Sequence, residues 1–377
     1  MINELEIKDF TVFPNANFLF GDKLNIIIGE NSSGKTHLLK LLYAMIHVLQ
    51  EHKNIGGHKS YNNASVSSFL KEILSVFNVT DVISLLNWNA KSRKKEIKAK
   101  PDELSNPGML EKLVLKGVKS FINLVTSDNN NRYYHLLEFT NDNLKFENYI
   151  QKESRYSPVE SFRPCIFLPS RELLTIYPHF LSLRREFQLP YDSTYDDTIA
   201  KLGLPLRNNK SEQAIEIIQT LESAIGGKIF LKNEKFYYHP NDMPVSMNWE
   251  IDMLAEGWRK LGMILQLLQD GSLREGTVLL WDEPEANLNP QLIRLVAWII
   301  LLLSQMDIQI FLTTHSLFLV YELEMLIAKQ KIKDGVRYFN LRKGKPVEQG
   351  NTFPELKNVL LVDESIKQTS QYLEEEF

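Results

Sequence analysis

The sequence predicts an α/β protein whose largely parallel sheet is covered by helices on both faces. One apolar run, at 24–28, leads into a glycine-rich loop and then an amphipathic helical pattern. Two later apolar runs, at 277–281 and 308–314, end in polar residues and alternate with helical segments. This alternation is typical of parallel sheets. Such sheets bind ligands at the carboxyl ends of their strands, so the polar residues that follow these runs are the functional candidates.

The chain opens with a predicted hairpin over residues 2–20. Leu5 and Ile7 alternate with charged residues, and a turn is expected at Pro14-Asn15 before a second strand at 17–20. The later pattern first predicts helical stretches at 69–77 and 82–86, strands flanking 128–131 and a strand at 166–169. It then predicts a helical region at 173–187, a loop, a helix at 211–225, and a hairpin of 228–231 and 235–238 turned through Asn233-Glu234. The last predicted elements are helices at 258–270 and from Pro290, a strand pair at 336–341 and 346–349, and a polar, acidic end.

The loop at 29–36 has the G-x-x-x-x-G-K-T pattern of a P-loop, in the strand–loop–helix context that a P-loop requires. Its glycines let the backbone N–H groups converge on phosphate oxygens, and the following helix directs its positive end at the same anion. Lys35 is expected to reach the β- and γ-phosphates and to act in catalysis, and Thr36 to bind Mg²⁺. The expected ATP-binding residues are Gly29, Asn31, Ser32, Ser33, Gly34, Lys35, Thr36 and His37.

Two later strand ends supply the rest of the predicted chemistry. Asp282, after the run at 277–281, is expected to bind Mg²⁺, and Glu283 to polarise the attacking water. His315, after Thr313-Thr314, is expected to sense the γ-phosphate and to link it to Glu283. The sequence therefore predicts an ATP·Mg²⁺ site with Glu283, His315 and Lys35 as catalytic residues.

The order of these motifs resembles the ABC-type ATPase heads of the RecF/SMC/OLD group. The matching segments are 5–10, 29–36, 254–260, 279–284 and 313–316, which correspond to the opening strand, Walker A, signature, Walker B and His-switch motifs. Residues 285–290 resemble the D-loop of the OLD-like branch. The resemblance implies a P-loop NTPase of the ABC-head type, with a mixed sheet, an N-terminal β-rich lobe and a helical insertion. No sustained heptads occur between 36 and 254, so no long coiled coil is expected.

The resemblance also assigns three further site residues. Gly257 of the signature would contact ATP in trans across a dimer, and Asn289, which stands where the D-loop usually has Asp, would also bind the nucleotide. Glu172, in the loop after the strand at 166–169, is expected to substitute as a metal ligand. At the signature, Ala255 and Glu256 replace the usual Ser and first Gly, which weakens the expected dimer closure.

Composition narrows the classes of partner. The net charge of −4 gives no overall attraction for nucleic acid, so DNA contact would need a local basic patch such as 91–95 or 184–185. Cys165 is the only cysteine, which excludes an intramolecular disulfide and fits a reducing, cytoplasmic location. No signal peptide or membrane span is predicted. The expected divisions are 1–50, 51–165, 166–250, 251–320 and 321–377.

The chain is also similar to the stand-alone ATPase subunits of bacterial antiphage systems of the Septu, retron-associated and PARIS types. This implies a slow ATPase that forms a homodimer or higher oligomer and gates a separate nuclease or toxin. The residues after His315 are too few for a Toprim nuclease domain and contain no Asp-x-Asp, so the effector is expected on another chain. Two alternatives stay open: a RecF-like DNA repair or loading ATPase, and an ATP-binding scaffold with negligible turnover.

Overall fold

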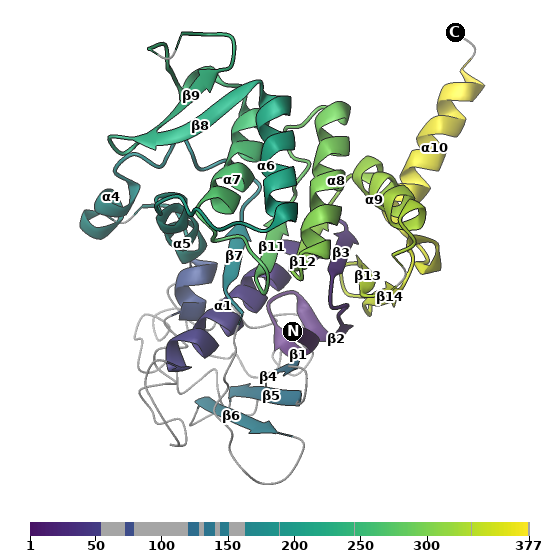
Figure 1. Cartoon of the computed structure of the whole chain (residues 1–377). Coiled ribbons are helices and arrows are strands. Elements are labelled where there is room, and N and C mark those ends of the chain that lie inside the picture. The colour runs from purple at the N-terminus through teal and green to yellow at the C-terminus, as the bar shows by residue number, and fades with distance from the viewer. Residues whose placement is uncertain are drawn as a thin grey trace, which may run out of the picture. The chain divides into compact units, whose positions relative to one another are not determined.

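The computed structural model describes residues 1–53, 72–78, 120–127, 132–139, 144–150, 163–187, 189–244, 246–332 and 334–375. The chain divides into two compact units, drawn together in Figure 1. Unit 1 comprises Met1–Asp22, Ile27–Phe162 and Val336–Phe377, and unit 2 comprises Lys23–Ile26 and Arg163–Gly335. The expected helix at 82–86, the basic run at 91–95 and the turn at 128–131 lie outside the described residues. The five sequence divisions stay a prediction.

Unit 1 contains the predicted N-terminal hairpin. Strands β1 (Ile2–Phe10) and β2 (Phe13–Leu19) pair antiparallel. The antiparallel sheet continues through β4 (Ser120–Ser127), β5 (Arg132–Phe139) and β6 (Leu144–Ile150), in the order β2-β1-β4-β5-β6.

The predicted position of the hairpin turn is wrong. Phe10 pairs with Phe13, so the turn lies at Thr11-Val12, where Thr11 has a φ of 47°. Pro14 and Asn15 belong to β2 instead. Proline has no N–H to donate, but β2 is the edge strand of this sheet, so no further strand beyond it needs that donor.

The P-loop strand β3 (Leu24–Gly29) is buried along its whole length and leads to helix α1 (Lys35–Lys53). In unit 1 the end of β3 lies next to β13 (Val336–Leu341), which pairs antiparallel with β14 (Glu348–Gly350). A short 3₁₀ turn, η5 (Phe353–Glu355), follows. The polar C-terminal end forms a helix, α10 (Leu360–Glu374), all of whose residues are at least partly exposed.

Unit 2 is built on parallel strands. Strand β11 (Val278–Asp282) pairs in parallel with β7 (Cys165–Leu168) on one side and β12 (Gln309–Thr314) on the other. The first residues of β3 lie beyond β12, where the Ile310 N–H donates to the Lys23 carbonyl at 2.8 Å. With the antiparallel pair of unit 1, the sheet is mixed, as predicted.

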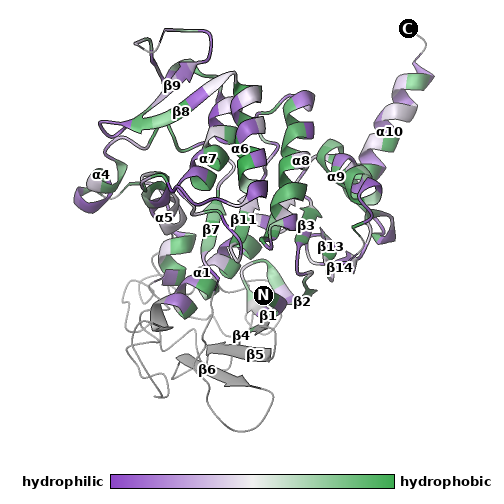
Figure 2. Ribbon diagram, viewed as in Figure 1, coloured by the Kyte–Doolittle hydropathy of each residue, from purple (hydrophilic) through white to green (hydrophobic). Residues whose placement is uncertain are grey.

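The helices of unit 2 are α4 (Phe180–Glu186), α5 (Ser193–Leu202), α6 (Glu212–Ile225), α7 (Glu256–Gln269), α8 (Pro290–Gln305) and α9 (Leu317–Lys329). Apolar residues dominate β7, β11 and α8 in Figure 2. Helix α8 begins at Pro290 as expected, with Asn289 as its N-cap. Beside these helices, β8 (Gly227–Lys232) and β9 (Lys235–Pro240) form the predicted hairpin, and β10 (Trp249–Glu250) and η4 (Ile251–Met253) lead to α7.

Two local expectations in unit 2 are wrong. Residues 171–179 form turns instead of the expected helix, which is limited to α4. The Glu172 carboxylate accepts the Leu174 and Thr175 N–H groups and the Thr175 hydroxyl, contacts that hold this segment as a turn. The predicted loop before α6 contains α5, whose N-cap Asp192 accepts the Thr194 N–H.

No helix in the described ranges exceeds the 19 residues of α1, so these ranges contain no long coiled-coil arm. None of the helices searched there has the length and apolar character needed to cross a bilayer.

Candidate active site

In unit 1 the P-loop closes around the ammonium group of Lys35. This side chain is buried, and its Nζ donates to the carbonyls of Gly29 and Glu30, both at 2.9 Å. Ser32 and Gly34 have positive φ angles of 62° and 102°, so the backbone reverses twice within the loop. The loop therefore has the curled path that the sequence predicted.

The loop is also shaped to exclude side chains at two positions. A Cβ on Gly29 would lie 2.3 Å from the Leu341 carbonyl oxygen, and a Cβ on Gly34 would lie 2.5 Å from Val12 Cγ2. The Ser33 hydroxyl is buried and has no hydrogen-bond partner among the described residues. A buried hydroxyl without a partner, in a loop at a helix N-terminus, suits a phosphate ligand.

The remaining P-loop candidates lie around this core. Asn31 and Ser32 are exposed at the tip of the loop, and Thr36, the second residue of α1, is half-buried. The His37 ring meets Phe77 edge-on, with the ring centroids 5.4 Å apart. Burial lowers the pKa of His37, and the nearby charge of Lys40 adds to this shift. Its predicted nucleotide contact stays a prediction.

In unit 2 the carboxyl ends of β11 and β12 bring Asp282 and Thr313 together. The two residues are register partners, and the Thr313 hydroxyl donates to Asp282 Oδ1 at 2.5 Å. Asp282 is buried, so this bond fixes its carboxylate at the sheet edge. A fixed carboxylate of this kind offers the hard oxygen ligand that Mg²⁺ prefers.

Glu283 and His315 form an ion-pair contact beside this carboxylate, with His315 Nε2 3.2 Å from Glu283 Oε1. Both side chains are about one-third exposed, at 34% for Glu283 and 29% for His315. Glu283 has a φ of 46°, and its N–H donates to the Thr313 carbonyl at 3.1 Å. The structure thus brings together the two residues that the sequence proposed to act as a pair.

Two charged residues next to this pair, the buried Lys260 and the half-buried Glu285, were not named as site residues from the sequence. Lys260 of α7 donates through Nζ to the Glu283 carbonyl at 2.6 Å. Burial lowers the pKa of Lys260 to about 8, although the charges of Glu285, Glu283 and Asp282 oppose this. Burial also raises the pKa of Glu285, whose Oε1 accepts the Thr314 hydroxyl and the His315 N–H. A lysine directly before the largely apolar stretch 261–268 was the signal available in the sequence.

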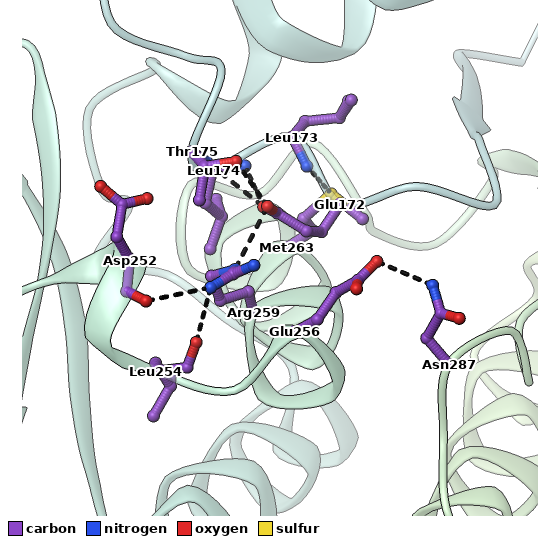
Figure 3. A network of polar contacts seen from close by, with 10 residues as sticks. All are labelled: Glu172, Leu173, Leu174, Thr175, Asp252, Leu254, Glu256, Arg259, Met263 and Asn287. Carbon is purple, nitrogen blue, oxygen red and sulfur yellow. Dashed lines mark hydrogen bonds and ion pairs between the residues drawn. The ribbon is translucent and has the colours of Figure 1, made fainter.

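The signature residues pack against the segment after β11. A Cβ on Gly257 would lie 2.9 Å from Leu288 Cδ2, so the glycine allows close packing within the chain. Next to it, Glu256 accepts a hydrogen bond from Asn287 Nδ2 at 2.8 Å (Figure 3). Asn289 Oδ1 accepts the Leu292 N–H at 2.9 Å and so caps α8. Contacts of Gly257 and Asn289 with ATP stay predictions.

Glu172 has a different environment from the one expected of a metal ligand. Oε2 accepts the Leu174 N–H at 2.9 Å, and Oε1 accepts the Thr175 hydroxyl at 2.5 Å and pairs with Arg259 Nε at 3.2 Å (Figure 3). Arg259 also donates to the carbonyls of Asp252 and Leu254. Because both carboxylate oxygens bind within the protein, the geometry favours a brace between the loop after β7 and α7 over the predicted metal ligand.

The fold and the site residues define the class of the protein. It has a P-loop ATPase fold similar to that of an SMC head. A solved structure of an SMC head bound to the C-winged helix domain of ScpA aligns with a TM-score of 0.50 at 13% identity, covering 93% of this chain and 97% of that one.

Sequence comparisons give shorter matches. A protein-family model described as "AAA domain, putative AbiEii toxin, Type IV TA system" matches residues 159–320. The DNA replication and repair protein RecF of Bacillus cytotoxicus is 41% identical over 44 residues, 12% of either chain. RecF of Bacillus mycoides is 30% identical over 80 residues, 18% of this chain and 21% of RecF. The chain thus spans only a small part of these relatives. The matches thus show sequence similarity to an AAA-domain family model over 159–320 and to RecF over short segments, and the likeness to the SMC head is one of fold.

Proposed function

We propose that the chain is a slow ABC-type ATPase that binds and hydrolyses ATP·Mg²⁺ and thereby gates a separate effector protein. One observation carries the hydrolytic part: Glu283 and His315 contact each other at 3.2 Å directly after Asp282, at the ends of adjacent parallel strands. A water-activating carboxylate next to a buried carboxylate at a strand end is the arrangement that nucleotide hydrolysis requires.

The proposed roles follow from the chemistry of each group. Lys35 neutralises the phosphates, and Thr36 and Asp282 would hold Mg²⁺, which stabilises the charge that develops on them. Glu283 orients the attacking water and accepts its proton, while His315 fixes the Glu283 carboxylate and senses the γ-phosphate. Support comes from the buried Lys35 ammonium in unit 1 and from the Glu283–His315 contact in unit 2.

We further propose that the active form is a homodimer or higher oligomer in which Gly257 of one copy contacts ATP bound to the next. Ala255 and Glu256 are exposed next to Gly257, so this stretch offers backbone N–H groups to a second copy. Because no serine hydroxyl stands there, closure relies on fewer contacts and turnover is slow.

The proposed effector is a nuclease or toxin of bacterial antiphage defence. The matching family model carries the words "putative AbiEii toxin, Type IV TA system", which name a toxin–antitoxin system. The SMC head with a similar fold was solved bound to another protein. Both descriptions favour a function exercised through a partner chain.

A RecF-like DNA repair or loading ATPase is the second candidate, because the curated matches are RecF proteins. In the basic candidate patch at 184–185, Arg184 is already paired with Asp196 at 3.3 Å, which leaves a smaller local charge for DNA. This candidate predicts ATPase activity that DNA stimulates and that falls steeply with salt. DNA-independent turnover in low salt would argue against it.

The test compares Glu283→Gln with Lys35→Ala. Glu283→Gln should lower kcat by about 10²–10⁴-fold while ATP still binds, because the general base is lost and the phosphate contacts remain. Lys35→Ala should abolish ATP binding itself. Glu322→Gln, on α9, is the matched control, because this carboxylate pairs with Arg294 and has no proposed part in the chemistry. Unchanged turnover in Glu283→Gln would remove Glu283 from the mechanism.

The in-trans contact is tested by measuring the oligomer size of the Glu283→Gln protein with ATP. If the unaltered chain binds ATP but shows no turnover, the scaffold alternative is favoured. Neighbouring genes test the role: an adjacent nuclease or toxin gene supports defence, and replication genes support the RecF-like alternative.

A further inference from the structure

The carboxylate of Glu285, a half-buried residue, contacts the end of β12 at Thr314 and His315. Glu285 Oε1 accepts the Thr314 hydroxyl at 2.6 Å and the His315 N–H at 3.0 Å. Its second oxygen, Oε2, is buried without a hydrogen-bond partner in the described part of the chain. Burying a carboxylate oxygen costs free energy unless hydrogen bonds within the protein replace those to water, so this placement calls for an explanation.

The contacts of Glu285 converge on one neighbour. Glu283 holds the His315 ring through Nε2, and Glu285 holds the His315 main chain through its N–H. The two glutamates are separated only by Pro284. The turn after β11 therefore contacts both the side chain of His315, through Glu283, and its backbone N–H, through Glu285.

Lys260 supplies the opposite charge for this turn. Its Nζ donates to the Glu283 carbonyl at 2.6 Å and approaches the Ala286 carbonyl at 3.4 Å, which brackets Glu285 in the chain. The Ala286 N–H also donates to the Glu283 carbonyl, so the turn is closed from both ends. An ammonium beside a buried carboxylate reduces the cost of burying either one.

We propose that Glu285 is a positioning residue that acts through His315, holding its backbone so that the imidazole meets Glu283. This inference rests on the proposed function of His315 and adds a residue to that site. Without Glu285, the end of β12 loses an acceptor for two donors, and the His315 ring no longer has a fixed distance from Glu283. Catalytic geometry is sensitive to displacements of this kind.

The experiment is a double-mutant cycle of Glu285→Ala and His315→Ala, read as kcat and KM for ATP in the full chain. Glu285→Ala should lower kcat by about 10- to 100-fold, the effect of one hydrogen bond to a charged group, with KM nearly unchanged. Glu285→Gln keeps an acceptor oxygen and should restore most of the loss. On the His315→Ala background, Glu285→Ala should add no further loss, because both changes remove one coupled element.

Hydrogen exchange gives a readout that does not depend on turnover. The His315 amide should exchange faster in Glu285→Ala than in the unaltered protein without nucleotide, and Glu322→Ala should leave it unchanged. If His315→Ala leaves kcat unchanged, the proposed function of His315 fails. If His315→Ala lowers kcat and Glu285→Ala either has no effect or adds an independent loss, only the role of Glu285 is refuted.

Discussion

Replacing Glu172 separates the two functions that this carboxylate could have. In the structure, its side chain is only 6% exposed and pairs with Arg259, whose side chain is 18% exposed. It also accepts the N–H groups of Leu174 and Thr175 and the Thr175 hydroxyl. Glu172→Ala removes all of these acceptors at once, and the change should therefore appear as lost stability.

The magnitude follows from the partners that remain. Removing one partner of a buried ion pair costs about 3–5 kcal/mol, because the other charge stays buried without compensation. Arg259 keeps its bonds to the Asp252 and Leu254 carbonyls, which places the expected loss near the lower end, about 3 kcal/mol. Glu172→Gln keeps one acceptor oxygen and should cost about 1–2 kcal/mol.

The assay is urea unfolding without nucleotide, followed by a Mg²⁺ titration of ATPase activity. Glu216→Ala on α6 is the control, because this glutamate is exposed and should change stability by less than about 0.5 kcal/mol. A metal ligand would behave in the opposite way. Unchanged stability in Glu172→Ala, together with a strongly increased Mg²⁺ requirement, would refute the brace and restore the sequence-based assignment.

Two further predictions concern a P-loop glycine and a buried acid. Gly34→Ala should destabilise the P-loop by about 1–3 kcal/mol and weaken ATP binding, because φ is +102° and the new Cβ would lie 2.5 Å from Val12 Cγ2. Gly276→Ala, with φ +79° and no atom within 4 Å, is the control that has strain without the clash; equal ATP affinities in both variants would contradict this explanation. Burial raises the pKa of Asp270 to about 6, against about 3.9 in an unfolded chain, so the folded state binds this proton more tightly. The contribution of Asp270 to stability is therefore largest below pH 4 and falls by up to about 3 kcal/mol as the pH rises to 6. Urea unfolding from pH 4 to 7 should show this decline, and Asp270→Asn should lack that component; identical slopes would refute it.

The elements that the sequence predicted correctly are those whose signals are local. The buried strand β3, the first helical position of Pro290 and the β8–β9 hairpin each depend on residues adjacent in the chain. The hairpin turn places Asn233 and Glu234 at φ angles of 51° and 57°, as a two-residue turn of this kind requires. Local patterning of this kind needs no knowledge of the tertiary fold.

One failure arises where a side chain at a distance decides the backbone, and another where a local helix cap was overlooked. Helical spacing over 173–187 looked regular, but the Glu172 carboxylate contacts 174–175 in a turn, and Arg259, 87 residues later, fixes that carboxylate. Helix α5 was missed because its N-cap Asp192 stands in a Pro/Tyr/Asp stretch that resembles a loop. The Arg259 contact lies outside any local window, whereas the Asp192 cap is a local signal.

In the candidate site, too, the sequence predicted the residues but not the contacts that orient them. Asp282, Glu283 and His315 could be named from strand ends, but the arrangement that orients them could not. Glu283 adopts a φ of 46°, a conformation that costs energy in a non-glycine residue and persists only where its surroundings enforce it. Thr313 accepts its N–H, and Lys260 donates to its carbonyl. A strained residue held at both peptide groups, next to the histidine that it contacts, indicates a geometry maintained for chemistry, and the Glu285 cycle tests that interpretation directly.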